Sequence, residues 1–333
     1  MKKGQTENPE KLKFAFYWAA SCGGCEVAVL DIDEKILNVV AAADILFWPV
    51  ALDTKYKDVE AMKDKNIDVC FFNGAIRTSE NEHMAKLLRN KAKVLVAFGA
   101  CACSGGIPGL ANVGNREEVF DVAYLSSPST HNTDKTTPKT STRVEEGELT
   151  LPEFYDIVKT LDQVVDVDYY LPGCPPSPKL ISDAVDAIVQ NKLPPKGSVL
   201  APLKSVCDEC KFEKSEKRIA ETKRIYEVKD IDANKCLLEQ GIICMGPATR
   251  GGCEARCLNA NMPCTGCGGP TPESLDQGAK MISALASILG IEDEQKMSQK
   301  DIEELIEKVS DPLGTFYKYT LPASVINRRI KEQ

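Results

Sequence analysis

The chain has 333 residues, enough for two domains, and 43% of them are apolar, which suffices for a buried core. Its net charge of −8 disfavours a nucleic-acid or anionic-membrane partner. No apolar run approaches the roughly 18–20 residues of a membrane span. The short run FAFYWAA after a polar start lacks the pattern of a signal peptide. We therefore expect a soluble, cytoplasmic protein.

The first two thirds of the chain alternate between strand and helix patterns. After a polar tail at 1–11, short apolar runs predict strands at 12–19, 44–50, 67–73, 93–98 and 166–171. Helical patterns fall at 26–42, 58–65, 79–91, 116–124, 152–163 and 178–191. Such alternation, with nearly continuous apolar strands, predicts an α/β fold with a doubly wound parallel sheet. The Ser-, Thr- and Pro-rich segment 126–150 is expected to be a surface insertion, with His131 in a loop and not a ligand.

Towards the C-terminus, apolar residues recur at helical spacing in 273–289. SQKD at 298–301 resembles a capping box that opens another helix. The aromatic tail 316–326 either packs on its own domain or forms a subunit interface. The charged run KFEKSEKR (211–218) is expected to be a solvated face.

Cysteines follow three of the predicted strands. The first strand leads into SCGGC (Cys22, Cys25), the fourth into GACAC (Cys101, Cys103) and the fifth into PGCPP (Cys174). Ligands of a parallel sheet gather beyond the carboxyl ends of its strands. Two thiols from the first loop and one from each of the others would make a four-thiolate site. Glycine-rich loops could instead cradle phosphate, but neither GxGxxG nor a Walker motif is present.

Eight further cysteines lie within residues 207–267, as CDEC (207–210), Cys236, Cys244, Cys253, Cys257 and CTGC (264–267). They suffice for two four-thiolate sites. Disulfides are disfavoured in a cytosolic chain. Soft thiolates select zinc or iron–sulfur clusters, and local spacing alone leaves that choice open. Cys70, within VCFF, is expected to be a small buried hydrophobe.

Taken together, these motifs resemble the small subunit of nickel–iron hydrogenases. CxxCE, GACACSGGI and PGCPP carry the resemblance in the first part, and CDEC, CLLEQGIICMGP and PCTGCGGPTPE carry it in the second. It covers about residues 12–275. It implies a flavodoxin-like domain at 12–198 and a small irregular iron–sulfur domain at 199–275, followed by a helical extension at 276–333. The nickel–iron centre would lie on a partner large subunit.

The resemblance also implies ligands for three 4Fe–4S clusters. The proximal cluster would take Cys22, Cys25, Cys101 and Cys174. The medial cluster would take Cys253, Cys257, Cys264 and Cys267. The distal cluster would take Cys207, Cys210, Cys236 and Cys244. Better-known periplasmic members have histidine at the position of Cys207 and proline at that of Cys257, so both clusters here would be all-thiolate and four-iron. Cys103 would be a packed thiol beside the proximal site.

Glu26 follows Cys25, and in the family a glutamate there relays protons towards nickel. The alternative is an acid placed in the first helical turn by the helix dipole.

The chain looks most like the cytoplasmic methyl-viologen-reducing (deazaflavin-coenzyme non-reducing) hydrogenase small subunit of methanogens. The resemblance implies that electrons pass from hydrogen through a 2Fe–2S subunit to heterodisulfide reductase. Two alternatives stay open at this point: a quinone-reductase subunit of complex I type, and a zinc-stabilised structural protein.

Overall fold

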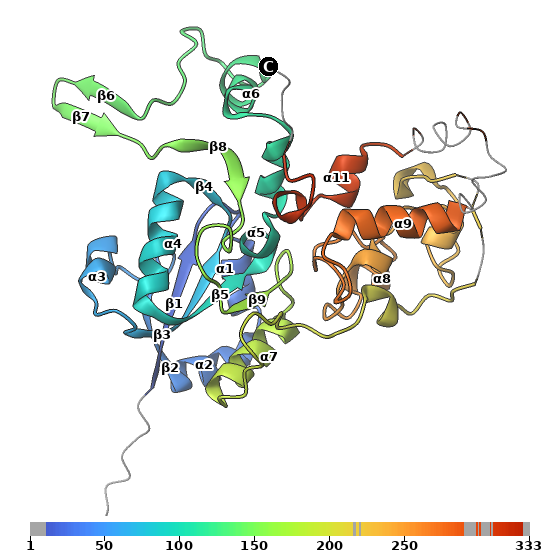
Figure 1. The fold of residues 1–333 in the computed structure, drawn as a ribbon, viewed down its shortest axis with the longest axis horizontal. Helices are drawn as coiled ribbons and strands as arrows, with labels where there is room; N and C mark the ends of the chain where they lie inside the picture. The colour runs from blue at the N-terminus through green and yellow to red at the C-terminus, as the bar shows by residue number, and fades with distance from the viewer. Residues whose placement is uncertain are drawn as a thin grey trace, which may run out of the picture.

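The computed structural model describes residues 11–215, 218–219, 221–289, 298, 300, 307 and 309–328. Its centre is a five-stranded sheet of β1 (Leu12–Trp18), β2 (Ala43–Phe47), β3 (Ile67–Asn73), β5 (Ala92–Phe98) and β9 (Tyr169–Leu171). The order is β2-β1-β3-β5-β9 and every neighbouring pair is parallel (Figure 1). This is the flavodoxin-like order. The predicted α/β fold is confirmed, and all five predicted strands form.

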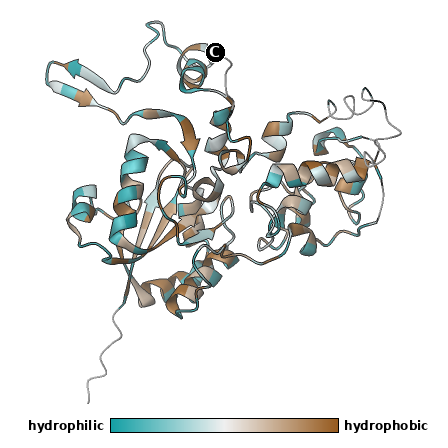
Figure 2. Cartoon of the chain, viewed as in Figure 1, coloured by the Kyte–Doolittle hydropathy of each residue, from teal (hydrophilic) through white to brown (hydrophobic). Residues whose placement is uncertain are grey.

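Both faces of the sheet are buried. Successive side chains of a strand point to opposite sides, so each strand contributes to two hydrophobic clusters. Phe14 and Phe16 belong to one hydrophobic cluster, whereas Ala15 and Tyr17 belong to another. The first cluster is completed by helices α1 (Gly24–Leu30), α2 (Ile36–Ala42) and α7 (Pro178–Val189). The second is completed by α3 (Tyr56–Ala61) and α4 (Ser79–Lys91). Figure 2 shows the resulting hydrophobic colouring of the central strands.

Two predicted helices differ from the structure. The segment 26–42 is broken into α1 and α2 by a 3₁₀ turn (Asp33–Lys35), in which Asp33 has φ of 54°. The prediction of a helix at 152–163 is wrong. That segment contains strand β8 (Phe154–Lys159), which pairs antiparallel with β4 (Ile76–Thr78). The aromatic and β-branched residues of β8 suit a strand, and pairing with β4 decides the outcome.

The predicted insertion is an exposed excursion from the sheet. Helix α6 (Arg116–Phe120) continues into a π-helical turn (Asp121–Ser126). A hairpin of β6 (Ser141–Val144) and β7 (Gly147–Thr150) then projects from the body, with every residue exposed (Figure 1). His131 is exposed in the loop before it, as predicted.

A separate hydrophobic cluster lies within residues 206–321, where regular structure is sparse. The α-helices described in this region are α8 (Arg256–Asn259), α9 (Gln277–Leu289) and α11 (Pro312–Phe316). Phe316 and Leu321 are buried in it, so much of the aromatic tail packs on its own chain. Phe212 is also buried, which corrects the solvated-face prediction at that position.

The tail also joins this C-terminal cluster to the sheet. The carbonyl of Tyr319 accepts hydrogen bonds from the backbone of Gly106, at 3.0 Å, and from the Ser104 hydroxyl, at 2.9 Å. Residues 216 and 217, and residues 299 and 301 of the predicted capping box, lie outside the described residues. In the described part of the chain, no helix combines the length and apolar character needed to cross a bilayer. The domain boundaries expected from the sequence stay predictions.

Candidate metal centres

The first thiol set forms where three parallel strands end at one edge of the sheet. It comprises Cys22 and Cys25 after β1, Cys101 on α5 (Gly99–Ser104) after β5, and Cys174 after β9. A hydrogen bond from Ala100 N to Gly173 O, at 2.7 Å, ties two of these loops together. Burial raises the pKa of Cys101 to about 12, and the charges of Cys174 and Cys22 add to the shift. Cys22, Cys101 and Cys174 therefore lie near one another at this edge, and a single four-thiolate site formed by them with Cys25 stays a prediction.

Glycine leaves room for sulfur in this set. A Cβ added to Gly99 would lie 2.3 Å from the Sγ atom of Cys25, and one on Gly106 would lie 2.5 Å from that of Cys101. Both glycines have positive φ, of 83° and 56°. No larger residue could take either position without displacing a thiol.

Cys103 and Cys70 are not among the four thiols of this set, although Cys103 is near enough for its charge to add to the raised pKa of Cys25. The Cys103 thiol donates to the carbonyl of Ala97 at 3.3 Å and packs among the side chains beneath the sheet edge. Cys70 is fully buried in β3. Both behave as packed thiols, as predicted.

A second set gathers Cys207, Cys210, Cys236 and Cys244. Burial raises the pKa of Cys207 to about 12; Lys214 opposes this shift, and the other three thiols reinforce it. Cys207 lies in a 3₁₀ turn (Val206–Asp208) whose first N–H groups are capped by the Asp208 carboxylate and Ser205. Burial also raises the pKa of Cys244 to about 11, although backbone N–H groups of Gly246 and Cys264 oppose it.

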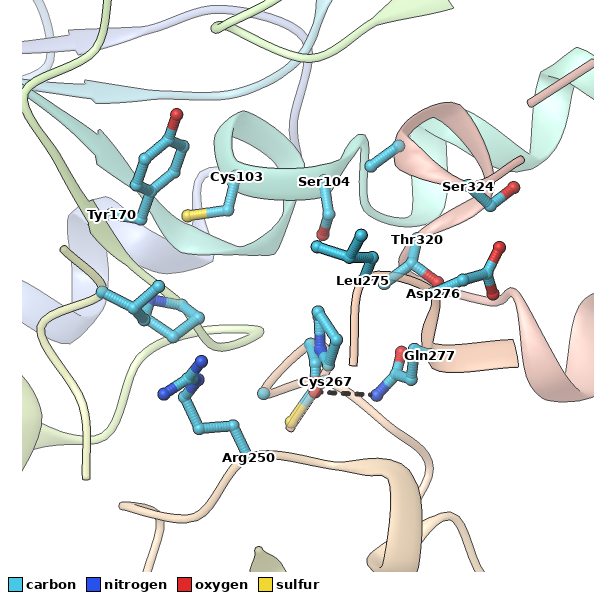
Figure 3. Close-up of a pocket in the computed structure, with 16 residues that line it drawn as sticks. Cys103, Ser104, Tyr170, Arg250, Cys267, Leu275, Asp276, Gln277, Thr320 and Ser324 are labelled. Carbon is cyan, nitrogen blue, oxygen red and sulfur yellow. Dashed lines mark hydrogen bonds between the residues drawn. The ribbon is translucent and has the colours of Figure 1, made fainter. Parts of the chain in front are cut away.

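The third set gathers Cys253, Cys257, Cys264 and Cys267. Burial raises the pKa of Cys267 to about 11, and the charges of Cys253 and Cys257 contribute. Its loop is held by the buried side chain of Gln277, whose Nε2 donates to the carbonyls of Gly266 at 2.8 Å and Gly269 at 3.0 Å. Figure 3 shows Gln277 beside Cys267 at a cavity of about 140 Å³. Cys257 lies on α8 and is exposed.

Adjacent sets lie close to one another. Cys174, in the first set, acts on the pKa of the Cys267 thiol in the third, which its backbone lowers and its charge raises. The backbone N of Cys264, in the third set, donates to Sγ of Cys244, in the second, at 3.3 Å. The third set therefore lies between the other two, which gives a row that begins at the sheet edge.

Four sulfur donors in each set, most of them partly or fully buried, fit either iron–sulfur clusters or thiolate-bound zinc. Hydrogen bonds from backbone N–H to sulfur are among the features that tune cluster potentials. Within the described residues, no three His, Cys, Asp or Glu side chains converge tightly enough to be identified as a site for one metal ion.

Glu26 lies in the first turn of α1 and is only 3% exposed. Its carboxylate accepts hydrogen bonds from Trp48 Nε1 and, at 3.5 Å, from Asn73 Nδ2. Burial raises its pKa, and these two bonds oppose the rise. Sequence reasoning missed both donors, although Asn73 ends β3 at the same edge as the first thiol set.

Comparisons with known proteins agree over nearly the whole chain. Residues 22–188 match the family model described as NADH ubiquinone oxidoreductase, 20 Kd subunit. The chain is 43% identical to the iron–sulfur subunit of the F420-non-reducing hydrogenase of Archaeoglobus profundus, covering 96% of this chain and 99% of the relative. It is 39% identical to a subunit of the F420-non-reducing hydrogenase of Methanothermobacter marburgensis, covering 97% and 99%. A solved NAD+-reducing [NiFe]-hydrogenase chain is 26% identical, with a TM-score of 0.47, covering 56% of this chain and 94% of that one.

Proposed function

The chain belongs to the family of F420-non-reducing hydrogenase iron–sulfur subunits, and we propose that it is the electron-transfer subunit of its enzyme. It is thus part of an oxidoreductase that acts on hydrogen. The match to the quinone-reductase family model ends at residue 188, before the eight-cysteine region, whereas the hydrogenase relatives cover that region. Membership in the hydrogenase family replaces both alternatives, the complex I-type subunit and the zinc-stabilised structural protein.

We assign three 4Fe–4S clusters to the three thiol sets. Cys22, Cys25, Cys101 and Cys174 would hold the proximal cluster, Cys253, Cys257, Cys264 and Cys267 the medial one, and Cys207, Cys210, Cys236 and Cys244 the distal one. When bound, these clusters supply one-electron transfer. The chain holds them in a fixed row and limits access of water to most of the sulfurs.

The observation that carries this proposal is the row itself. Cys174 of the first set lies close enough to Cys267 of the third to shift its pKa, and the backbone N of Cys264 in the third set donates to the Cys244 sulfur of the second. A protein that only stored metal, or used it for structural stability, would not need each thiol set to lie beside the next. Conduction does, since each transfer requires neighbouring centres.

The proposed partners follow from electron transfer along this row, from the proximal set to the distal set. A large subunit carrying the nickel–iron centre would cover the sheet edge beside the proximal set and supply electrons from hydrogen. A 2Fe–2S subunit would accept them at the distal set and pass them to heterodisulfide reductase. The enzyme proposed here would act in the cytoplasm and serve methanogenesis.

Glu26 is proposed to relay protons at the same edge. Its carboxyl group is buried beside Cys25 and held by Trp48 and Asn73, and its pKa is raised by burial. A raised pKa brings the protonated form closer to the working pH, which suits proton transfer.

Anaerobic purification with metal analysis tests the proposal. Three four-iron clusters require about twelve iron atoms per chain and a brown colour. Cys174→Ser should lose about four of these irons and stop hydrogen-dependent viologen reduction. Cys70→Ala, which removes a buried thiol outside the three sets, should keep all of them. Stoichiometric zinc with no iron in the wild type, or normal turnover in Cys174→Ser with the large subunit bound, would contradict the assignment.

A further inference from the structure

A cavity of about 820 Å³ is lined in part by Ala19 and Ala20, which directly precede the loop of the first thiol set in the chain. It is bounded by the start of α4, the β4–β8 pair and α6, and Ala20 and Arg77 line it. Ala20 follows β1 and precedes Cys22 by two residues, while Arg77 lies on β4, which follows β3. The cavity therefore belongs to the same edge of the sheet as the proposed proximal site.

Arg77 brings an unpaired charge to this cavity. The residue is only 5% exposed, and neither Nη1 nor Nη2 has a hydrogen-bond partner. Its guanidinium lies 4.3 Å from the ring centroid of Phe154. Asp156 acts on it at longer range, but a carboxylate oxygen of Asp156 accepts its hydrogen bond from the backbone of Arg116. A buried cation without hydrogen-bonded acceptors is costly, so this arrangement favours an incoming anion.

Most of the other charged side chains that line the cavity are also positive. Arg116 and Lys139 join Arg77, against the single acid Glu80, in a chain whose net charge is −8. The Glu80 carboxylate is engaged by the hydroxyl of Tyr56. The cavity is thus a local exception to the acidic character of the chain.

Exposed apolar side chains also line the cavity. Leu151 is 56% exposed and Tyr124 is 38% exposed. A free small anion would pair with Arg77 but leave these apolar side chains in water. A protein surface would cover both.

We infer that this cavity receives a carboxylate side chain of the large subunit, which pairs with Arg77 when the two subunits associate. The inference rests on the proposed function, because that partner is the one expected to cover the sheet edge beside Cys22. Nη1 and Nη2 are buried as well as unpaired, so the guanidinium would turn towards the opening to form the two parallel hydrogen bonds that arginine makes with a carboxylate. Arg77 then contributes to assembly and not to conduction.

Arg77→Gln tests this in the iron-loaded chain. Removing one partner of a buried charged pair should weaken association with the large subunit by at least about 30-fold at low salt, and reduce its salt dependence. Arg143→Gln is the matched control, because it removes the same charge from the exposed strand β6, outside the cavity. It should change the affinity by less than about twofold. Both variants should keep the wild-type iron content.

A second measurement leaves Arg77 unchanged. A photoreactive benzoylphenylalanine in place of Tyr124, which lines the cavity, should crosslink to an Asp- or Glu-containing peptide of the large subunit. The same group in place of the exposed Tyr226, outside the cavity, is the control and should not reach that peptide.

Unchanged affinity of Arg77→Gln, an equal loss in Arg143→Gln, or no crosslink from position 124 in the assembled complex would overturn the inference. Citrate that stabilises the free wild-type chain but not Arg77→Gln, with association unaffected, would identify a free-anion site and overturn it too. Failure of the proposed function is separate: the wild-type chain would then hold no iron or would not bind the large subunit.

Discussion

Gly99 offers a test of the proximal site that leaves every thiol in place. It precedes Cys101 by two residues and has φ of +83°. The Cβ atom of Gly99→Ala would lie 2.3 Å from the Sγ atom of Cys25, whereas non-bonded heavy atoms settle at about 3.5 Å or more. The sulfur would have to move by about 1 Å, and binding constellations tolerate only about 0.5 Å.

The backbone cost of the same substitution can be separated from this clash. An alanine in the left-handed region costs roughly 1–2 kcal/mol. Gly197 has φ of +85°, and a Cβ there would meet nothing within 4 Å. Gly197→Ala therefore carries the backbone cost alone and is the matched control for Gly99→Ala.

Iron analysis and thermal unfolding of the two variants, purified anaerobically, give the answer. Gly197→Ala should keep about twelve irons, with stability lowered by roughly 1–2 kcal/mol. Gly99→Ala should lose about four irons while the other eight remain. Full iron and normal hydrogen turnover in Gly99→Ala would refute the reasoning, since Cys25 could then not occupy a tightly held ligand position.

Three further predictions concern other residues. Cys257 lies in the first turn of α8, where proline is tolerated, so Cys257→Pro should keep the fold and show the EPR signal of a three-iron cluster when oxidised. Cys257→Ala should show the same signal, and its absence from both variants would exclude Cys257 as a ligand. Glu26→Gln should keep its iron but lower hydrogen turnover and proton exchange by about 100-fold; unaltered activity would return Glu26 to the helix-dipole interpretation. Asp168→Asn should cost roughly 3 kcal/mol of unfolding free energy at pH 7, because Asp168 is buried and paired with Arg89 at 2.6 Å.

The pH dependence of the Asp168 contribution has a definite sign. Burial alone would raise the pKa of this carboxyl, but hydrogen bonds from Lys196, Arg89 and the backbone of Leu95 lower it below its usual value. A carboxyl group with a lowered pKa in the folded state stabilises the fold above about pH 4 and loses that contribution as the pH falls further. The difference between wild type and Asp168→Asn in denaturant titrations should therefore shrink below about pH 4. A difference that stays constant from pH 7 to pH 3 would contradict this account.

The sheet and its cysteine-bearing edge could be predicted because both depend on local signals. The strands are short apolar runs, and cysteines directly follow the strands now described as β1, β5 and β9. Carboxyl ends of parallel strands share one edge, so chain order alone brings the thiols of Cys22, Cys101 and Cys174 together.

Interactions between segments far apart in the chain could not be predicted from the sequence. Strand β8 has the apolar spacing of a short helix, and only its pairing with β4 fixes it as a strand. Phe212 lies within a charged run and is buried by residues far along the chain. Arg77 carries no motif, and its significance appears only when Phe154, almost 80 residues later, lies against its guanidinium.

The division of the eight later cysteines into two sets could not be predicted from the sequence either. The same contacts show that the position of one set depends on its neighbours. Spacing pairs Cys264 with Cys267 but does not indicate which other thiols join them. In the structure, the backbone of Cys264 donates to the Cys244 sulfur of the neighbouring set, while Cys174 of the first set lies close enough to shift the pKa of Cys267. The CTGC loop is therefore fixed from both sides, and its position follows from where the sheet edge and the Cys244 turn lie. Since each set helps to orient the next, a change at one site should alter the hydrogen bonds, and hence the potential, of its neighbour.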